Sequence, residues 1–201
     1  MPMASAMIRG LSNVEQCLAK AAEYAAAGRE EDARKLVRRA VSLDPDHPGA
    51  QLRWAVELLD RPKVARYHLR RAAELGRGDP AIEYQVACVL LDLGDLDGAL
   101  FLARRARGHI DDDYRLLPGL VNLTGRLAAA GGHAEVAEEA LGLAFALEPE
   151  MAWHGRTLAQ FLREQGRDMA ALEVARVALR HSPDDQGLRS MVERLRAVAV
   201  V

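Results

Sequence analysis

A pair of alanines seven residues apart recurs five times along this 201-residue chain. Two helices can cross closely only where their side chains are small, and a seven-residue spacing keeps both alanines on one helical face. The first alanines of successive pairs are 32, 34, 38 and 34 residues apart. A period near 34 residues predicts stacked helical hairpins rather than a single globular core. The pairs are Ala33/Ala40, Ala65/Ala72, Ala99/Ala106, Ala137/Ala144 and Ala171/Ala178.

Glycine and proline occupy fixed places around these pairs. A glycine stands five residues before the first alanine in four repeats, and a proline stands five residues after the second alanine in three. Glycine suits the left-handed turn that ends a helix, and proline cannot continue a helix. In the second repeat, Asp60-Arg61-Pro62 replaces the glycine turn. We expect hairpins at 14–45, 48–77, 80–110, 118–149 and 152–183.

The two ends of the chain lie outside the five repeats. Residues 1–13 carry no clear pattern, and we expect this segment to fray. Residues 184–201 contain an amphipathic stretch, 188–198, that has no partner helix. We expect this stretch to cap the apolar face of the fifth hairpin and to end in a short apolar tail.

Composition limits the class of protein. Half of the residues are apolar but only 4% are aromatic, and strong helix formers dominate, which favours an all-α chain. A net charge of −2 gives no electrostatic reason to bind nucleic acid or an anionic membrane. The sequence shows neither a signal-peptide pattern nor an apolar stretch that could insert in a membrane, so we expect a cytoplasmic protein. Cys17 and Cys88 are the only cysteines and predict no disulfide framework.

The repeat resembles the tetratricopeptide repeat over about residues 14–183. Besides the alanines and prolines, Tyr24 stands where that family places a first-helix tyrosine, and Gly125 stands where it places a small residue. The family's first-helix tryptophan is absent from all five repeats. The resemblance implies an all-α, right-handed superhelix of about five helical hairpins with a C-terminal capping helix, in which the first helices line a concave groove.

We find no arrangement of residues that predicts catalysis. The six histidines are widely separated, and the chain has no phosphate-binding glycine loop and no Gly-x-Ser-x-Gly motif. The cluster His109-x-Asp111-Asp112-Asp113 could hold a hard cation, but it fits better an inter-repeat loop whose aspartates cap the next helix. We therefore expect no enzyme activity, no cofactor and no metal.

The inner faces of the first helices supply the candidate binding residues. Arginine, amide and aromatic side chains are those that hold an extended peptide or its terminal carboxylate. Arg156 and Arg163 are seven residues apart and share a helical face, and Arg126 holds on the preceding first helix the place of Gln160. An ordinary solvated face is the alternative interpretation. The predicted groove comprises Arg53, Tyr84, Gln85, Cys88, Asn122, Arg126, Trp153, Arg156, Gln160 and Arg163.

Two functions fit this pattern. The first is a non-catalytic scaffold or adaptor whose groove binds a protein or peptide that is acidic or has a free C-terminal carboxylate. The alternative is a secretion- or assembly-type chaperone, compatible with a homodimer, that shields an apolar client segment against the Ala/Leu-rich start of the groove and the Val198-Ala-Val-Val tail. Salt separates the two, because an arginine site weakens with ionic strength whereas apolar burial does not.

Overall fold

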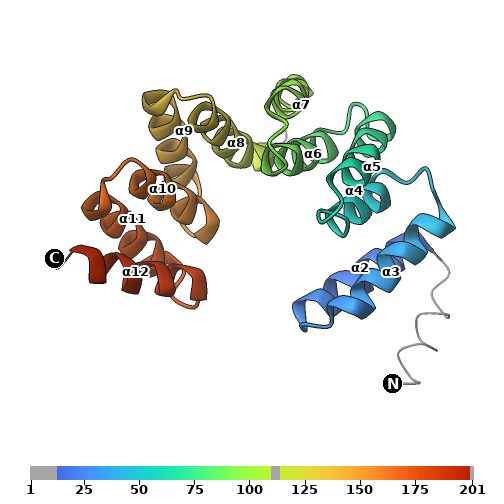
Figure 1. Cartoon of the computed structure of the whole chain (residues 1–201), viewed down its shortest axis with the longest axis horizontal. Helices are drawn as coiled ribbons and strands as arrows, with labels where there is room; N and C mark the ends of the chain where they lie inside the picture. Colours follow the sequence, from blue (N-terminus) through green and yellow to red (C-terminus); the bar gives the residue numbers. More distant parts are fainter. Residues whose placement is uncertain (1–12, 110–113, 200–201) are drawn as a thin grey trace. The chain divides into compact units, whose positions relative to one another are not determined.

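The computed structural model describes residues 13–109 and 114–199, and these residues form two compact units (Figure 1). Unit 1 ends at His109 and unit 2 begins at Ile110. Each unit is described by itself. Our expectations for residues 1–12, for the aspartates at 111–113 and for residues 200–201 lie outside the described residues.

Unit 1 contains six helices in its described part, and they pack in consecutive antiparallel pairs. Within each pair the first helix packs most extensively on the second, and the second also packs on the first helix of the next pair. The pairs are α2 (Val14–Ala26) with α3 (Glu30–Leu43), α4 (Pro48–Val56) with α5 (Pro62–Leu75), and α6 (Pro80–Asp92) with α7 (Leu96–Gly108).

Unit 2 contains two further pairs and a final single helix. A short 3₁₀ turn, η1 (Tyr114–Leu116), leads into the first of these pairs. The last helix, α12 (Gln186–Ala199), packs on α11 and also contacts α10. The pairs are α8 (Leu117–Ala130) with α9 (Ala134–Leu147), and α10 (Ala152–Glu164) with α11 (Asp168–His181).

The alanines of the repeat lie where paired helices cross. The first and second alanines of every pair are buried, and most of them have no exposed surface. Ala99 and Ala106, for example, lie on the buried side of α7, and Ala171 and Ala178 on that of α11. Small side chains at these positions let the helix backbones approach, which is why a period visible in the sequence determines the pairing.

Turns with a left-handed glycine end four of the first helices. Gly28, Gly94, Gly132 and Gly166 have φ values between 69° and 80°, a backbone conformation that side-chain-bearing residues rarely adopt. After α2, for instance, Gly28 N–H donates to the Ala25 carbonyl and the next amide donates to Tyr24. The second hairpin lacks such a glycine; α4 ends early, at Val56, and Pro62 starts α5.

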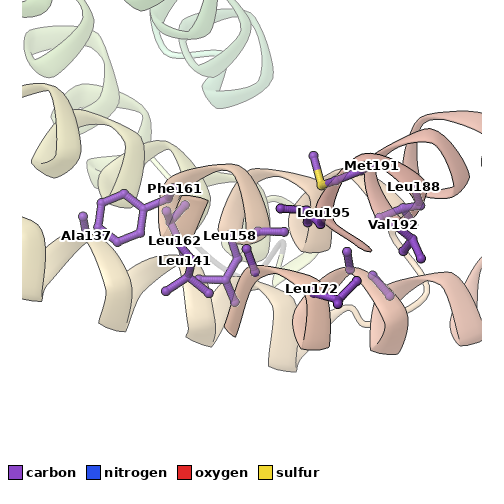
Figure 2. Close-up of a cluster of buried hydrophobic side chains, with 14 residues drawn as sticks. Ala137, Leu141, Leu158, Phe161, Leu162, Leu172, Leu188, Met191, Val192 and Leu195 are labelled. Carbon is purple, nitrogen blue, oxygen red and sulfur yellow. The ribbon is translucent and has the colours of Figure 1, made fainter. Parts of the chain in front are cut away.

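The apolar side of α12 completes the core of unit 2. Leu188, Met191, Val192 and Leu195 are buried against Leu172 of α11 and against side chains of α10, as Figure 2 shows. The opposite side of α12 carries exposed charged residues. Within the described residues, no helix has the length and apolar character needed to cross a membrane. The predicted all-α fold of helical hairpins is confirmed.

Candidate interaction site

One face of α10 carries four of the predicted binding residues. Trp153, Arg156, Gln160 and Arg163 are spaced by three, four and three residues, so they form one stripe along the helix. Gln160 and Arg163 are exposed, and Trp153 and Arg156 are half-buried. Gln160 donates a 2.9 Å hydrogen bond to Glu164. In the part of the chain that the structure describes, Arg163 has no ion pair. We call this stripe the α10 face.

Arg156 is held at the start of α12. Its Nη1 lies 3.5 Å from Asp185 Oδ1, and its side chain remains 42% exposed. Asp185 also accepts a 2.7 Å hydrogen bond from the Leu188 amide. A side chain at Gly187 would approach Arg156 Nη1 to 2.5 Å, so this glycine makes room for the guanidinium. The structure thus gives Arg156 a counter-ion within the chain.

Two more arginines occupy equivalent places on the neighbouring helices. Arg126 of α8 precedes Gln160 by 34 residues, and Arg194 of α12 follows it by 34. Arg126 is half-buried and Arg194 is exposed. Sequence reasoning missed Arg194 because α12 was interpreted only as a cap. The 34-residue spacing between Gln160 and Arg194, which equals the repeat period, was the signal that could have identified Arg194.

Asn122 was wrongly predicted to line an open surface. It is completely buried in α8, where its Nδ2 donates to His154 Nδ1 of α10 at 3.1 Å. His154 is equally buried, and its Nε2 lies 3.3 Å from Glu148 Oε2. Burial lowers the pKa of His154, and the neighbouring Glu148 carboxylate only partly opposes this effect. Asn122 therefore joins α8 to α10 behind the α10 face.

Trp153 is fixed by the same buried group. Its ring centroid lies 4.1 Å from that of His154, with the rings tilted by 32°. A half-buried indole that is stacked on a buried partner loses little further freedom when a ligand covers it. The indole of Trp153 is therefore held in place on the α10 face.

The remaining predicted residues lie in unit 1. Arg53 is on α4, and Tyr84, Gln85 and Cys88 are on α6, which packs beside α4. Arg53 and Gln85 are exposed, whereas Tyr84 and Cys88 are half-buried. The structure therefore assigns the predicted residues to two separate groups, one in each unit.

A buried carboxylate holds together two hairpins of unit 1. Glu83 has no exposed surface and accepts hydrogen bonds from Arg105 Nε at 2.6 Å and from the Gly78 amide at 3.0 Å. His109 Nδ1 lies 3.0 Å from its other oxygen. Burial alone would raise the pKa of Glu83, but the hydrogen bonds from Gly78, His109 and Arg105 outweigh it and lower that pKa. Arg105 also donates to the Ala73 carbonyl of α5, so the network is structural.

The described residues offer no metal site. Within 13–109 and 114–199, no three His, Cys, Asp or Glu side chains gather closely enough to hold an ion. His109, which the sequence placed in a possible cation cluster, contacts Glu83 instead. Cys17 and Cys88 form no disulfide, and burial raises the pKa of Cys17, which makes its thiol a poor nucleophile.

Comparisons with known proteins agree with this architecture. A family model described as a tetratricopeptide repeat matches residues 14–58. The crystal structure of TTC0263, a tetratricopeptide protein of Thermus thermophilus, superposes with a TM-score of 0.77 and 22% identity, covering 94% of this chain and 100% of that one. No curated protein matches the sequence. Residues 14–58 therefore match the tetratricopeptide repeat, and the described residues have the fold of tetratricopeptide proteins.

Two further solved structures share the fold. PilW, described as a widely conserved type IV pilus biogenesis factor, has a TM-score of 0.70 at 17% identity, over 92% of this chain and 90% of that one. Yeast Tom70 has a TM-score of 0.67 at 16% identity, over 94% of this chain and 40% of that one. Tetratricopeptide modules are in general protein-interaction scaffolds and are typically non-catalytic.

Proposed function

We propose that this module binds an acidic segment, or the terminal carboxylate, of a partner protein on the α10 face of unit 2. The observation that carries the proposal is the exposed Arg163, without an ion pair among the described residues, in one stripe with Arg156 and the anchored Trp153. The predicted residues of unit 1 would form a second contact for a longer partner.

The charges near this face favour an anion. Arg126 and Arg194 hold equivalent places on the flanking helices, and Arg156 keeps donors free because its contact with Asp185, at 3.5 Å, is too long for a strong hydrogen bond. Guanidinium groups bind carboxylates through paired N–H donors. Trp153 would cover an apolar side chain of the same segment.

A peptide-display selection with free C-termini tests the proposal. We expect the selected peptides to be rich in Asp and Glu or to depend on their terminal carboxylate, and to bind more weakly as salt increases. A charge-assisted hydrogen bond contributes about 1.5–3 kcal/mol, so Arg163→Ala should weaken binding by about tenfold or more.

Arg180 provides a matched control. It lies in the last turn of α11, as Arg163 lies in the last turn of α10, and it is also exposed. Arg180→Ala should leave peptide affinity unchanged. Equal losses from the two substitutions would rule out the α10 face. Selection of apolar peptides whose binding does not respond to salt would instead support a chaperone that shields an apolar client.

A further inference from the structure

The outer side of α7, in unit 1, exposes two adjacent apolar side chains at mid-helix. Phe101 is 61% exposed and Leu100 is 37% exposed. An aromatic ring left in water forgoes the large stabilisation that its burial would provide. Exposed apolar side chains that lie beside a cavity can mark an interaction surface.

Such a cavity opens between α5 and α7. It has a volume of about 350 Å³, and Phe101 is one of its lining residues. Most of its lining is apolar, but the charged residues Arg70, Glu74, Asp95 and Arg105 also line it, and Arg105 is bonded to Glu83. The volume and lining suit an aromatic or large aliphatic side chain. The apolar lining includes Leu69 and Ala73 of α5, Val86 and Leu90 of α6, and Leu102 of α7.

Charged residues flank this apolar centre in a symmetric pattern. Asp97 and Arg104 are exposed, seven residues apart, and therefore on one side of α7. Among the described residues neither forms an ion pair. Leu100 and Phe101 lie midway between them. A second α7 running antiparallel would set Asp97 against Arg104 at both ends and apolar side chains against each other at the centre.

Two other second helices, α11 and α3, lack this combination. On α11, Glu173 and Arg180 are also seven apart, but the exposed Arg176 lies near their midpoint. On α3, the midpoint between Glu31 and Arg38 is occupied by Arg34 and Lys35. An antiparallel copy of either helix would bring like charges together at its centre, which is unfavourable.

We propose that a second copy of this chain docks on α7, antiparallel about a two-fold axis that passes between Leu100 and Phe101. Phe101 of each copy enters the cavity of the other, and Asp97 pairs with Arg104 twice. The same surface serves both copies, so the interface closes as a dimer. This surface lies in unit 1 and is distinct from the α10 face, so the two proposals succeed or fail separately.

Charge exchange tests the pairing by sedimentation over about a hundredfold range of protein concentration. We expect the unaltered chain to form dimers. Asp97→Arg alone, or Arg104→Asp alone, creates two like-charge pairs and should weaken dimerisation by about tenfold or more. The double variant Asp97→Arg/Arg104→Asp restores opposite pairs and should recover the dimer. Glu173→Arg on α11 is the matched control and should leave the dimer intact.

Phe101→Ala tests the apolar contact. Because Phe101 is 61% exposed, its removal should change the melting curve of the single chain little while it abolishes the dimer. Distance measurement in solution between spin labels at residue 100 of the two copies would report the closest approach near the axis. A chain that stays monomeric at all concentrations, or a double charge variant that fails to recover, would overturn the proposal.

Discussion

Gly155 of α10 lies at a close crossing between α10 and α11. A Cβ at this position would approach Ala178 Cβ of α11 to 2.4 Å and Phe145 Cε2 of α9 to 3.2 Å. Ordinary contact begins at 3.4 Å, and the Ala178 Cβ is fixed to the backbone, so α10 and α11 must separate by about 1 Å. Overpacking of this kind costs about 1–3 kcal/mol.

Helix propensity works in the opposite direction. Replacement of glycine by alanine inside a helix stabilises it by about 0.5–1 kcal/mol. We therefore expect Gly155→Ala to lower the free energy of unfolding by a net value of up to about 2.5 kcal/mol. Urea denaturation followed by circular dichroism measures this change.

Gly142 of α9 gives the matched comparison. It also lies inside a helix, but a Cβ there would meet nothing within 4 Å. Gly142→Ala should therefore raise the free energy of unfolding by about 0.5–1 kcal/mol. If Gly155→Ala proved as stable as Gly142→Ala, the close approach of α10 and α11 would not exist, and our account of the crossing would be refuted.

Two other expectations concern the end of the chain and two histidines, the buried His154 and the half-buried His68. Deletion of residues 186–201 uncovers the apolar surface under Leu188 and Leu195, and the burial of each such side chain contributes about 1.5–3 kcal/mol. Calorimetry of the truncated chain should therefore show a lower melting temperature or aggregation. An unchanged melting curve would contradict the packing of α12. Burial lowers the pKa of both His68 and His154. Below a pH of about 6.5 the unfolded chain therefore binds protons at these two side chains that the folded chain does not bind. The free energy of unfolding should therefore decrease as the pH falls through that value, and His154→Gln should remove part of the decrease. Equal pH profiles for the variant and the unaltered chain would argue against a buried neutral His154.

The hairpin fold follows from the sequence because its causes are local and repeated. The small side chains of Ala99 and Ala171 let paired helices approach closely, as the corresponding alanines do in every repeat. The glycine turns need a backbone conformation that few other residues adopt. These requirements act within one hairpin of about 34 residues. The fold class could therefore be read without knowledge of how the repeats contact one another.

The arrangement of the site depended on contacts between repeats. We predicted a surface position for Asn122 because the register of the repeat places it on the face that lines the groove. Its hydrogen-bond partner His154, 32 residues away, is buried instead. Arg156 meets Asp185 only because α12 packs beside α10 and Gly187 leaves space. No local pattern in the sequence encodes these pairs. The binding role of the remaining residues stays a prediction.

The Glu83 network has a consequence for how unit 1 unfolds. In a repeat array, stability is a sum of terms within each repeat and terms between neighbours, so hairpins can in principle open one at a time. Glu83 is bonded to the loop after α5 and to Arg105, which reaches back to Ala73, so separating the second hairpin from the third breaks the hydrogen bonds of Glu83 with Gly78 and of Arg105 with Ala73. Each hydrogen bond that involves a charged group contributes about 1.5–3 kcal/mol. We therefore expect the core amide protons of the second and third hairpins to exchange together.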